Sequence, residues 1–207
     1  MAGRFISLEG GEGVGKSTQA RRLAAALRAR GLDVIETREP GGSEGAEAIR
    51  RLVLEGAGDR WTAPAEALLF AAARADHVEK TIKPAVAGGK WVLCDRYLDS
   101  SIAYQGGADG LGEQAIRTLH AIGSHGYLPD RTLLLSLPVA TASSRQFARD
   151  DGKGDRFESR GSGFHERVSA TFLQIAASEP DRFRVVDAEG SEEAVAARMI
   201  EAIEDLF

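Results

Sequence analysis

A glycine-rich stretch near the N-terminus constrains the possible folds more than any other feature of this sequence. Residues 10–18 read GGEGVGKST, in which Gly10, Gly15, Lys16 and Ser17 satisfy the pattern G-x-x-x-x-G-K-[ST]. The apolar run at 4–8 predicts a buried strand immediately before this loop. Apolar residues then recur after the loop at helical spacing, so the motif has the strand–loop–helix context that a phosphate-binding loop requires.

The chemistry of such a loop assigns a role to each part of it. Glycines allow the backbone to turn so that several N–H groups face one anion, and the following helix N-terminus adds its positive end. We expect Lys16 to reach the β- and γ-phosphates of ATP, and the Ser17 hydroxyl to ligate Mg²⁺. The predicted ATP-binding set is the loop itself, namely Gly10, Gly11, Glu12, Gly13, Val14, Gly15, Lys16, Ser17 and Thr18.

Length and composition favour one α/β domain in a reducing compartment. The chain has 207 residues, of which 43% are hydrophobic, and this is enough for a single packed core. The net charge of −5 provides no general attraction for nucleic acid or for an anionic membrane. With one cysteine, Cys94, in an apolar run, and no apparent signal peptide or membrane span, we expect a cytoplasmic protein.

Strand and helix patterns alternate along the chain. Strands are predicted at 4–8, 33–37, 91–95, 131–137 and 182–187. Helices are predicted at 16–30, 43–54, 113–122, 139–149 and 163–178, and a long helix capped by Thr62 is predicted from 63 to near 84 or 87. Ser191 is predicted to cap a last helix. This order predicts a P-loop NTPase fold, a five-stranded parallel sheet with helices on both faces in three α/β/α layers. The segment 149–163 is polar and glycine-rich, so it is either a lid over the site or an ordinary surface loop.

Charged residues follow two of the predicted strands. Arg38 ends the second strand, and Asp95 and Arg96 end the third. Ligands of parallel sheets bind beyond these carboxyl ends, so Asp95 suits a Mg²⁺ site beside Ser17. Two arginines converging on one crevice predict a second phosphate site, because guanidinium groups bind phosphate in bidentate fashion. The alternative is that these arginines pair with nearby carboxylates, such as Glu39 and Asp99.

Several longer motifs resemble those of thymidylate kinase of the bacterial type. They are FISLEGGEGVGKST, TREPGG, LLFAAARADHVE, WVLCDRYLDSSIAYQG, YLPDRTLLL and DRFES, in this order, and they extend from about Phe5 to Leu173. The phosphate loop is common to many enzymes, whereas TREPGG together with DRYLDSSIAYQG is far more specific. The resemblance implies transfer of the ATP γ-phosphate to dTMP with Mg²⁺, by a homodimer of five-stranded α/β subunits.

The resemblance also assigns substrate-binding residues. Arg38 and Arg96 would hold the dTMP phosphate, Phe70 would stack on thymine, and Arg74 would hydrogen-bond a base carbonyl. Tyr104 would lie under the sugar and exclude a 2′-hydroxyl, while Ser101 and Gln105 would complete the pocket. Without the resemblance, Phe70 is typical of a core residue and Tyr104 of half-buried packing.

Some positions depart from the family pattern. Gly13 stands where some members carry an arginine that serves the transferred phosphoryl group, and Glu12 beside it would lie near the acceptor's sugar and phosphate. The lid would then have to supply positive charge, so we expect Arg149 or Arg156, or both, to act in catalysis and Arg145 to stack on adenine. Outside the phosphate loop, Ser136, Ser169 and Phe172 replace residues more common in the family.

Two alternatives to a dTMP kinase are open at this stage. The chain could be a kinase for another nucleoside or nucleoside monophosphate, or a P-loop ATPase or regulator that transfers nothing to an acceptor. The sequence also leaves open whether the Glu39–Pro40 peptide bond is cis. His77 lies in a predicted helix, and we expect it at the surface or in an interface.

Overall fold

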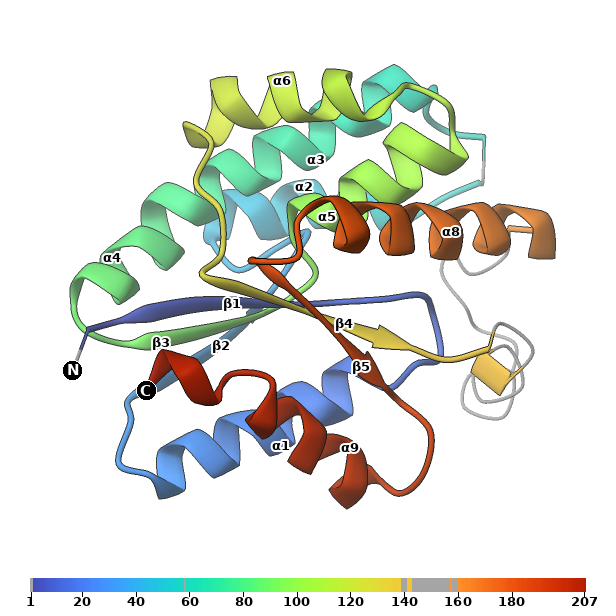
Figure 1. Ribbon diagram of the computed structural model, residues 1–207. Helices are drawn as coiled ribbons and strands as arrows, with labels where there is room; N and C mark the ends of the chain where they lie inside the picture. Colours follow the sequence, from blue (N-terminus) through green and yellow to red (C-terminus); the bar gives the residue numbers. More distant parts are fainter. Residues whose placement is uncertain (1, 58, 139–140, 143–156, 158–159) are drawn as a thin grey trace.

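The computed structural model describes residues 2–57, 59–138, 141–142, 157 and 160–207. Its centre is one five-stranded sheet (Figure 1), formed by β1 (Arg4–Glu9), β2 (Val34–Arg38), β3 (Trp91–Asp95), β4 (Arg131–Ser136) and β5 (Phe183–Asp187). The strand order is β2-β3-β1-β4-β5, and every neighbouring pair is parallel. The predicted five-stranded parallel α/β fold is therefore confirmed. The order changes direction at β1, so the loop after β1 opens at the switch point where ligands bind such sheets.

Helices cover both faces of the sheet, as Figure 1 shows. On one face, α1 (Lys16–Ala29) and α9 (Glu192–Glu201) bury side chains such as Leu23 and Met199 against the sheet. The other face carries α2 (Glu44–Leu54), α3 (Ala63–His77), α4 (Lys83–Ala87), α6 (Glu113–Ser124) and α8 (Ser162–Ser178). Alternate residues of β1 face opposite cores, because Phe5 belongs to the cluster under α8 and Ile6 to the cluster over α1.

The helix predicted at 63–87 is present, but its middle is wider than an α-helix. Between α3 and α4, the π-helical segment η1 (Val78–Ile82) continues the chain without a break. Pro84 has no backbone N–H, so the usual bond to the carbonyl four residues earlier cannot form. A π turn just before the proline absorbs this defect, and the helix continues.

Residues 98–108 form helical structure that the apolar pattern does not predict. The short helix α5 (Leu98–Ser101) leads directly into the π-helix η2 (Ile102–Ala108). The sequence here contains two consecutive serines and two consecutive glycines, which are weak helix formers. Tertiary packing compensates, since Ile102 and Ala103 are fully buried and α8 lies against η2.

The helix termini show which predicted caps form. The Ser191 side chain accepts a hydrogen bond from the Ala194 N–H, which confirms Ser191 as the cap of α9. Thr62 occupies the N-cap position of α3, but its side chain makes no capping hydrogen bond. The segment η3 (Glu204–Leu206) follows α9 near the C-terminus.

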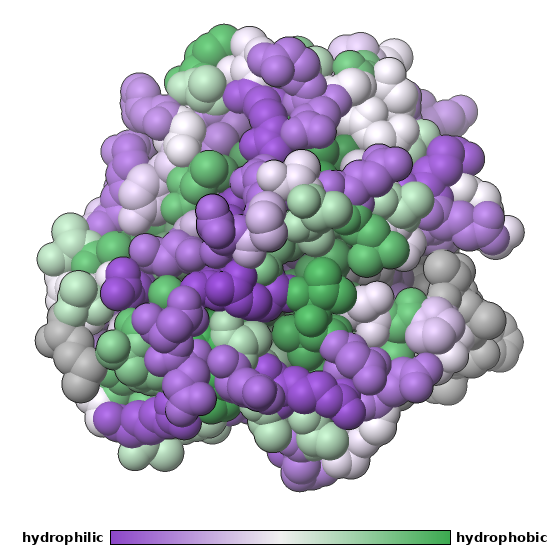
Figure 2. All heavy atoms as spheres, viewed as in Figure 1, coloured by the Kyte–Doolittle hydropathy of each residue, from purple (hydrophilic) through white to green (hydrophobic). Residues whose placement is uncertain are grey.

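The surface is mostly polar on the face drawn in Figure 2, with green apolar surface gathered where α8 and β5 lie in Figure 1. The exposed large apolar side chains of these two elements are Leu173 and Val185. Among the described residues, none of the helices combines the length and the apolar character needed to cross a membrane.

Candidate active site

The glycine-rich loop joins β1 to α1 as predicted, and its backbone requires glycine at two points. Gly15, the residue before α1, has a φ of 94°, in the left-handed region that favours glycine. Gly10 has a φ of 138°, and a Cβ atom there would lie 2.5 Å from the Leu135 carbonyl oxygen. The loop is therefore packed closely against the end of β4 at Gly10, where a side chain would force the backbone to move, whereas a side chain at Gly15 would be strained by its φ alone.

Lys16 lies inside the curve of this loop. Its ammonium group donates to the Gly10 carbonyl at 3.1 Å and to the Gly11 carbonyl at 2.7 Å, and the residue is buried. Burial and the neighbouring Arg96 guanidinium lower the pKa of Lys16. The ammonium group is thus held at the point where the loop borders an open hollow.

Ser17 and Asp95 meet beside Lys16. The Ser17 hydroxyl donates to Asp95 Oδ2 at 2.7 Å, although these residues belong to α1 and β3. A hydroxyl and a carboxylate oxygen are hard donors of the kind that Mg²⁺ accepts when phosphates and water complete its coordination. The donor set therefore fits the predicted metal, and the predicted pair of ligands is brought together.

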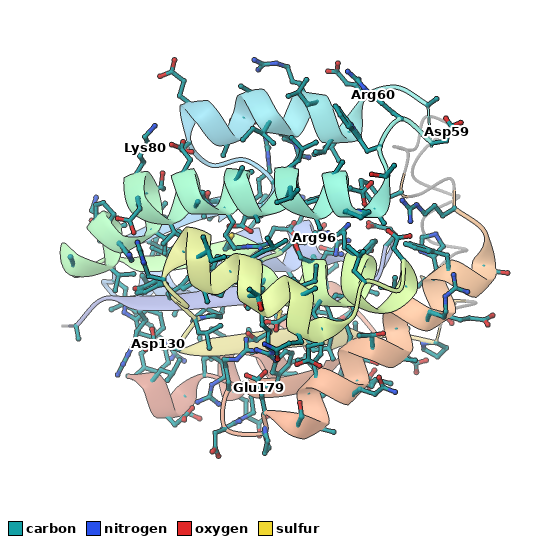
Figure 3. All side chains as sticks on the ribbon, turned by 90° about the horizontal axis from the view of Figure 1, so that it is seen from above. Asp59, Arg60, Lys80, Arg96, Asp130 and Glu179 are labelled. Carbon is teal, nitrogen blue, oxygen red and sulfur yellow. The ribbon has the colours of Figure 1, made fainter. Side chains whose placement is uncertain are left out.

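Arg96 connects the two halves of the site, and Figure 3 shows it near the middle of the molecule, whereas Lys80 and Asp59 lie at the periphery. Its φ of 70° places a non-glycine residue in the left-handed region, which is uncommon and strained. The backbone N–H donates to the Leu8 carbonyl at 2.9 Å, and the guanidinium donates to the Gly10 carbonyl at 3.0 Å. The turn after β3 is therefore attached both to β1 and to the phosphate loop.

Glu12 projects from the loop toward Arg96. Its carboxylate accepts from Arg96 Nη2 at 2.5 Å and from the Tyr104 hydroxyl at 2.9 Å. Burial opposes ionisation here, but the charges of Arg96 and Lys16 and the Tyr104 hydrogen bond outweigh it and lower the pKa of Glu12 to about 2. An acidic residue beside a phosphate site is thus tolerated because it is ionised and paired.

Glu9, which the sequence analysis did not single out, is fully buried at the end of β1. One carboxylate oxygen accepts from the backbone N–H groups of Tyr97 at 2.8 Å and Ser100 at 3.3 Å. The other oxygen is 2.6 Å from the Ser100 hydroxyl. Burial, followed by the charge of Asp99, raises the pKa of Glu9 to about 8. The sequence did contain a signal for Glu9, because a carboxyl residue stands directly after the apolar strand and before the phosphate loop.

A charged hollow of about 900 Å³ opens in front of the loop. It is lined by Glu12, Gly15, Lys16, Ser17, Thr18, Arg38, Glu39, Arg50, Asp95 and Arg96. Arg38 and Arg96 thus face one space together with Lys16, as the strand-end argument expects. Arg50, on α2, adds a third guanidinium that the sequence did not reveal, because it lies within a helix and not at a strand end.

In the described part of the chain both arginines pair with nearby carboxylates, as the alternative expects, although the partners are Glu47 and Glu12 instead of Glu39 and Asp99. Arg38 approaches Glu47 at 3.3 Å and its side chain is 56% exposed, while Arg96 pairs with Glu12. Asp99 instead pairs with Arg182 at 2.7 Å. Arg38 is therefore held by a largely exposed ion pair of small energetic value, which costs little to break.

An aromatic hollow of about 460 Å³ adjoins the charged one. Its lining is Glu12, Glu39, Pro40, Arg50, Phe70, Arg96, Ser100, Ser101, Tyr104, Gln105 and Phe157. Five of the predicted substrate residues are thus in one place, namely Phe70, Arg96, Ser101, Tyr104 and Gln105. The shared residues Glu12, Glu39, Arg50 and Arg96 form the boundary between the two hollows.

Arg74 lies behind the aromatic hollow and is buried. It donates to Glu39 at 2.7 Å and to the Ser101 hydroxyl at 2.8 Å. The prediction that His77 lies at a surface or interface is wrong, because His77 is 0% exposed and contacts Glu39 at 3.1 Å. Its other ring nitrogen is 2.8 Å from the Thr37 hydroxyl. The partners of His77 are Thr37 in β2 and Glu39 in the turn after it. A helical pattern in the sequence does not reveal such partners.

Three features complete the placement of the predicted residues. The Glu39–Pro40 peptide bond is cis. Arg145, Arg149 and Arg156, like most of the lid predicted at 149–163, lie outside the described residues. On the far side of the phosphate loop, a further hollow of about 570 Å³ is lined by Gly13, Val14, Gly15, Thr18, Gln19, Ala188, Gly190, Glu192 and Val195.

The strand order, the phosphate loop with its lysine, and the arginines across a shared hollow define a phosphoryl-transfer enzyme of the P-loop class. Comparison with known proteins narrows this class. The sequence profile described as thymidylate kinase matches residues 8–199. The chain belongs to the thymidylate kinase family.

Individual relatives agree with this assignment over the whole length. The chain is 71% identical to a thymidylate kinase of Rhizorhabdus wittichii over 207 residues, covering 100% of both chains. It is 52% identical to that of Caulobacter vibrioides, covering 97% of this chain and 96% of the other. The crystal structure of thymidylate kinase from Ehrlichia chaffeensis superposes with a TM-score of 0.79 at 30% identity, covering 98% of this chain and 100% of that one.

The buried carboxyl of Glu9 predicts a specific pH dependence of stability. With a pKa near 8 in the fold and 4.5 as its ordinary value, Glu9 retains a proton that the unfolded chain releases between these values. Its contribution to the free energy of unfolding is therefore full below pH 4.5 and lost as pH rises toward 8, by up to about 1.4 kcal/mol per pH unit. Glu9→Gln keeps an acceptor for Tyr97 and Ser100 but does not titrate. We expect the variant to gain stability relative to wild type from pH 5 to 8.

Urea denaturation at several pH values measures this difference. Glu201→Gln, an exposed position at the end of α9, serves as the control and should follow wild type. Parallel pH profiles for Glu9→Gln and wild type would show that Glu9 is ionised in the fold.

Proposed function

We propose that this chain transfers the γ-phosphoryl group of ATP to the phosphate of dTMP, giving dTDP, in the joined hollows around Arg96. Membership of the thymidylate kinase family identifies the enzyme as a dTMP kinase. The observation that carries the residue-level proposal is the placement of Lys16 and Arg96 on one shared space, with the aromatic hollow beyond it.

The donor nucleotide would bind along the phosphate loop. Backbone N–H groups of the loop and Lys16 would hold the β- and γ-phosphates. Ser17 and Asp95 would hold Mg²⁺, which when bound supplies positive charge to the phosphate oxygens. The hollow on the far side of the loop, beside Gly190, has room for the nucleoside part of ATP.

The acceptor would enter from the opposite side. Arg38, Arg50 and Arg96 would bind its phosphate, since guanidinium groups match phosphate oxygens in pairs. Phe70 would stack on the thymine ring at the bottom of the aromatic hollow. Tyr104, held by Glu12 and Arg96, would lie under the sugar.

Chemistry in this arrangement requires little beyond position and charge. The acceptor phosphate is largely ionised at neutral pH, because its second pKa is about 6, so a strong general base is unnecessary. Lys16 and the arginines would neutralise charge that develops during transfer. Glu12 would keep Arg96 aligned between the two phosphates, which places the reacting groups end to end.

The reaction assay follows from these roles. With purified protein and ATP–Mg²⁺, we expect ADP release to depend on dTMP in a panel with dUMP, UMP, dCMP, AMP and thymidine. Dependence on thymidine or AMP would identify a different kinase, and release without any acceptor would identify an ATPase. Lys16→Ala should abolish turnover, since the loop loses its phosphate-binding charge, yet keep the far-ultraviolet circular dichroism of the fold.

The lid arginines are proposed to stabilise the transferred group, because Gly13 leaves the loop without a side chain for that task. Arg149→Ala and Arg156→Ala, singly or together, should lower kcat by roughly 10³-fold in at least one variant, with smaller changes in dTMP affinity. Arg28→Ala, at the end of α1 far from the loop, is the control and should keep full activity. Unchanged kcat in all three lid variants would remove the lid from the mechanism.

We propose that two copies associate through α3 and the helices beside it. Support comes from exposed apolar side chains on neighbouring helices: Leu52 on α2, Leu68 on α3 and Ile122 on α6 are 42%, 56% and 73% exposed. Light scattering at micromolar concentration should give twice the 22.1 kDa chain mass. Leu68→Arg combined with Ile122→Arg should shift this mass toward one chain, whereas Leu173→Arg on α8 should not. A single-chain mass for wild type would contradict the proposal.

A further inference from the structure

Two buried side chains at the end of the aromatic hollow form a direct pair. Gln105, in the π-helix η2, donates from Nε2 to Oε1 of Glu66, in α3, at 2.8 Å. Each residue is only 1% exposed. Gln105 therefore lies in the wall of the hollow, and Glu66 is its buried partner behind that wall.

The carboxylate determines which end of the amide faces it. An ionised carboxylate only accepts hydrogen bonds, so Gln105 must present its NH₂ group to Glu66. Arg160 lies 3.6 Å from the second oxygen of Glu66 and supplies the opposite charge that a buried carboxylate requires. The orientation of the amide thus follows from the chemistry of its partner.

The carbonyl end of Gln105 then points the other way. Among the described residues, none donates a hydrogen bond to Gln105 Oε1. Gln105 lines the aromatic hollow together with Phe70, Ser101 and Tyr104. The Gln105 carbonyl is therefore a hydrogen-bond acceptor facing the hollow, and Glu66 fixes its direction.

We propose that Glu66 is a positioning residue that sets the base preference of the enzyme through Gln105. The inference rests on the proposed function, since it takes the aromatic hollow as the site of the acceptor base. Thymine and uracil carry an imide N–H that can donate to the Gln105 carbonyl, whereas cytosine has an unprotonated ring nitrogen at that position. Turning the amide to suit cytosine would place two acceptor oxygens 2.8 Å apart, so Glu66 opposes it.

The test is the ratio of kcat/KM for dTMP to that for dCMP. Glu66→Gln can donate as well as accept, so the Gln105 amide is free to turn. We expect kcat/KM to fall for dTMP and to rise for dCMP, lowering the ratio at least about tenfold. Asp109→Asn is the control, because the ion pair of Asp109 at 2.5 Å goes to Arg160 and not to Gln105, and its ratio should equal that of wild type.

A second variant separates positioning from folding. Exchanging the two side chains, in Glu66→Gln with Gln105→Glu, again pairs an amide donor with a carboxylate and leaves an acceptor facing the hollow. The exchange should recover part of the dTMP preference lost in Glu66→Gln. An equal loss with both substrates in Glu66→Gln, without recovery in the exchange, would mean a purely structural pair and would overturn the inference. Absence of dTMP activity in wild type would instead reject the proposed function.

Discussion

The attachment of Arg96 to the phosphate loop is the interaction on which the rest of the site depends. Arg96 holds a left-handed backbone conformation that costs on the order of 1 kcal/mol or more for a residue with a side chain. Hydrogen bonds to Leu8 and Gly10 compensate, and Glu9 holds the chain just after the turn. Because these bonds join β1, the loop and the segment after β3, the donor and acceptor sides form one rigid unit.

Local charge, and not the charge of the whole chain, makes this unit suitable for phosphates. The protein carries a net charge of −5, yet the charged hollow gathers Lys16, Arg38, Arg50 and Arg96. Such a concentration of positive groups around a loop is stable only if some are paired when no ligand is present. Glu12 provides this pairing for Arg96, and its own pKa is lowered to about 2 as a result.

The sequence predicts the frame of the molecule well because the frame depends on local patterns. Apolar periodicity locates all five strands of the described sheet, and the loop motif locates Lys16 and Ser17. The strand-end rule brings Asp95 and Arg96 to the right edge of the sheet. Only the family resemblance predicts Phe70 and Tyr104 as substrate residues, because the apolar periodicity alone assigns them to packing.

What the sequence does not predict depends on partners far away in the chain. His77 and Arg74 have the spacing of one helix face, but only the fold places both against Glu39. Arg50 is one of several arginines in a polar helix, and nothing local distinguishes it. Residues 98–108 have weak helix propensity, so their helical form follows from burial against α8.

Several of these partners are buried glutamates that orient the residues around them. Glu9, Glu39 and Glu66 are each buried, Glu39 in the wall shared by the two hollows and the other two behind lining residues, and each accepts hydrogen bonds from groups that line or support the hollows. A buried carboxylate without such partners would be strongly destabilising, so each one restricts its neighbours to a single orientation. The polar groups that face the hollows are therefore oriented by the fold before any ligand binds. Under the proposed function, this preorganisation would place the choice of substrate partly in residues behind the walls of the hollows.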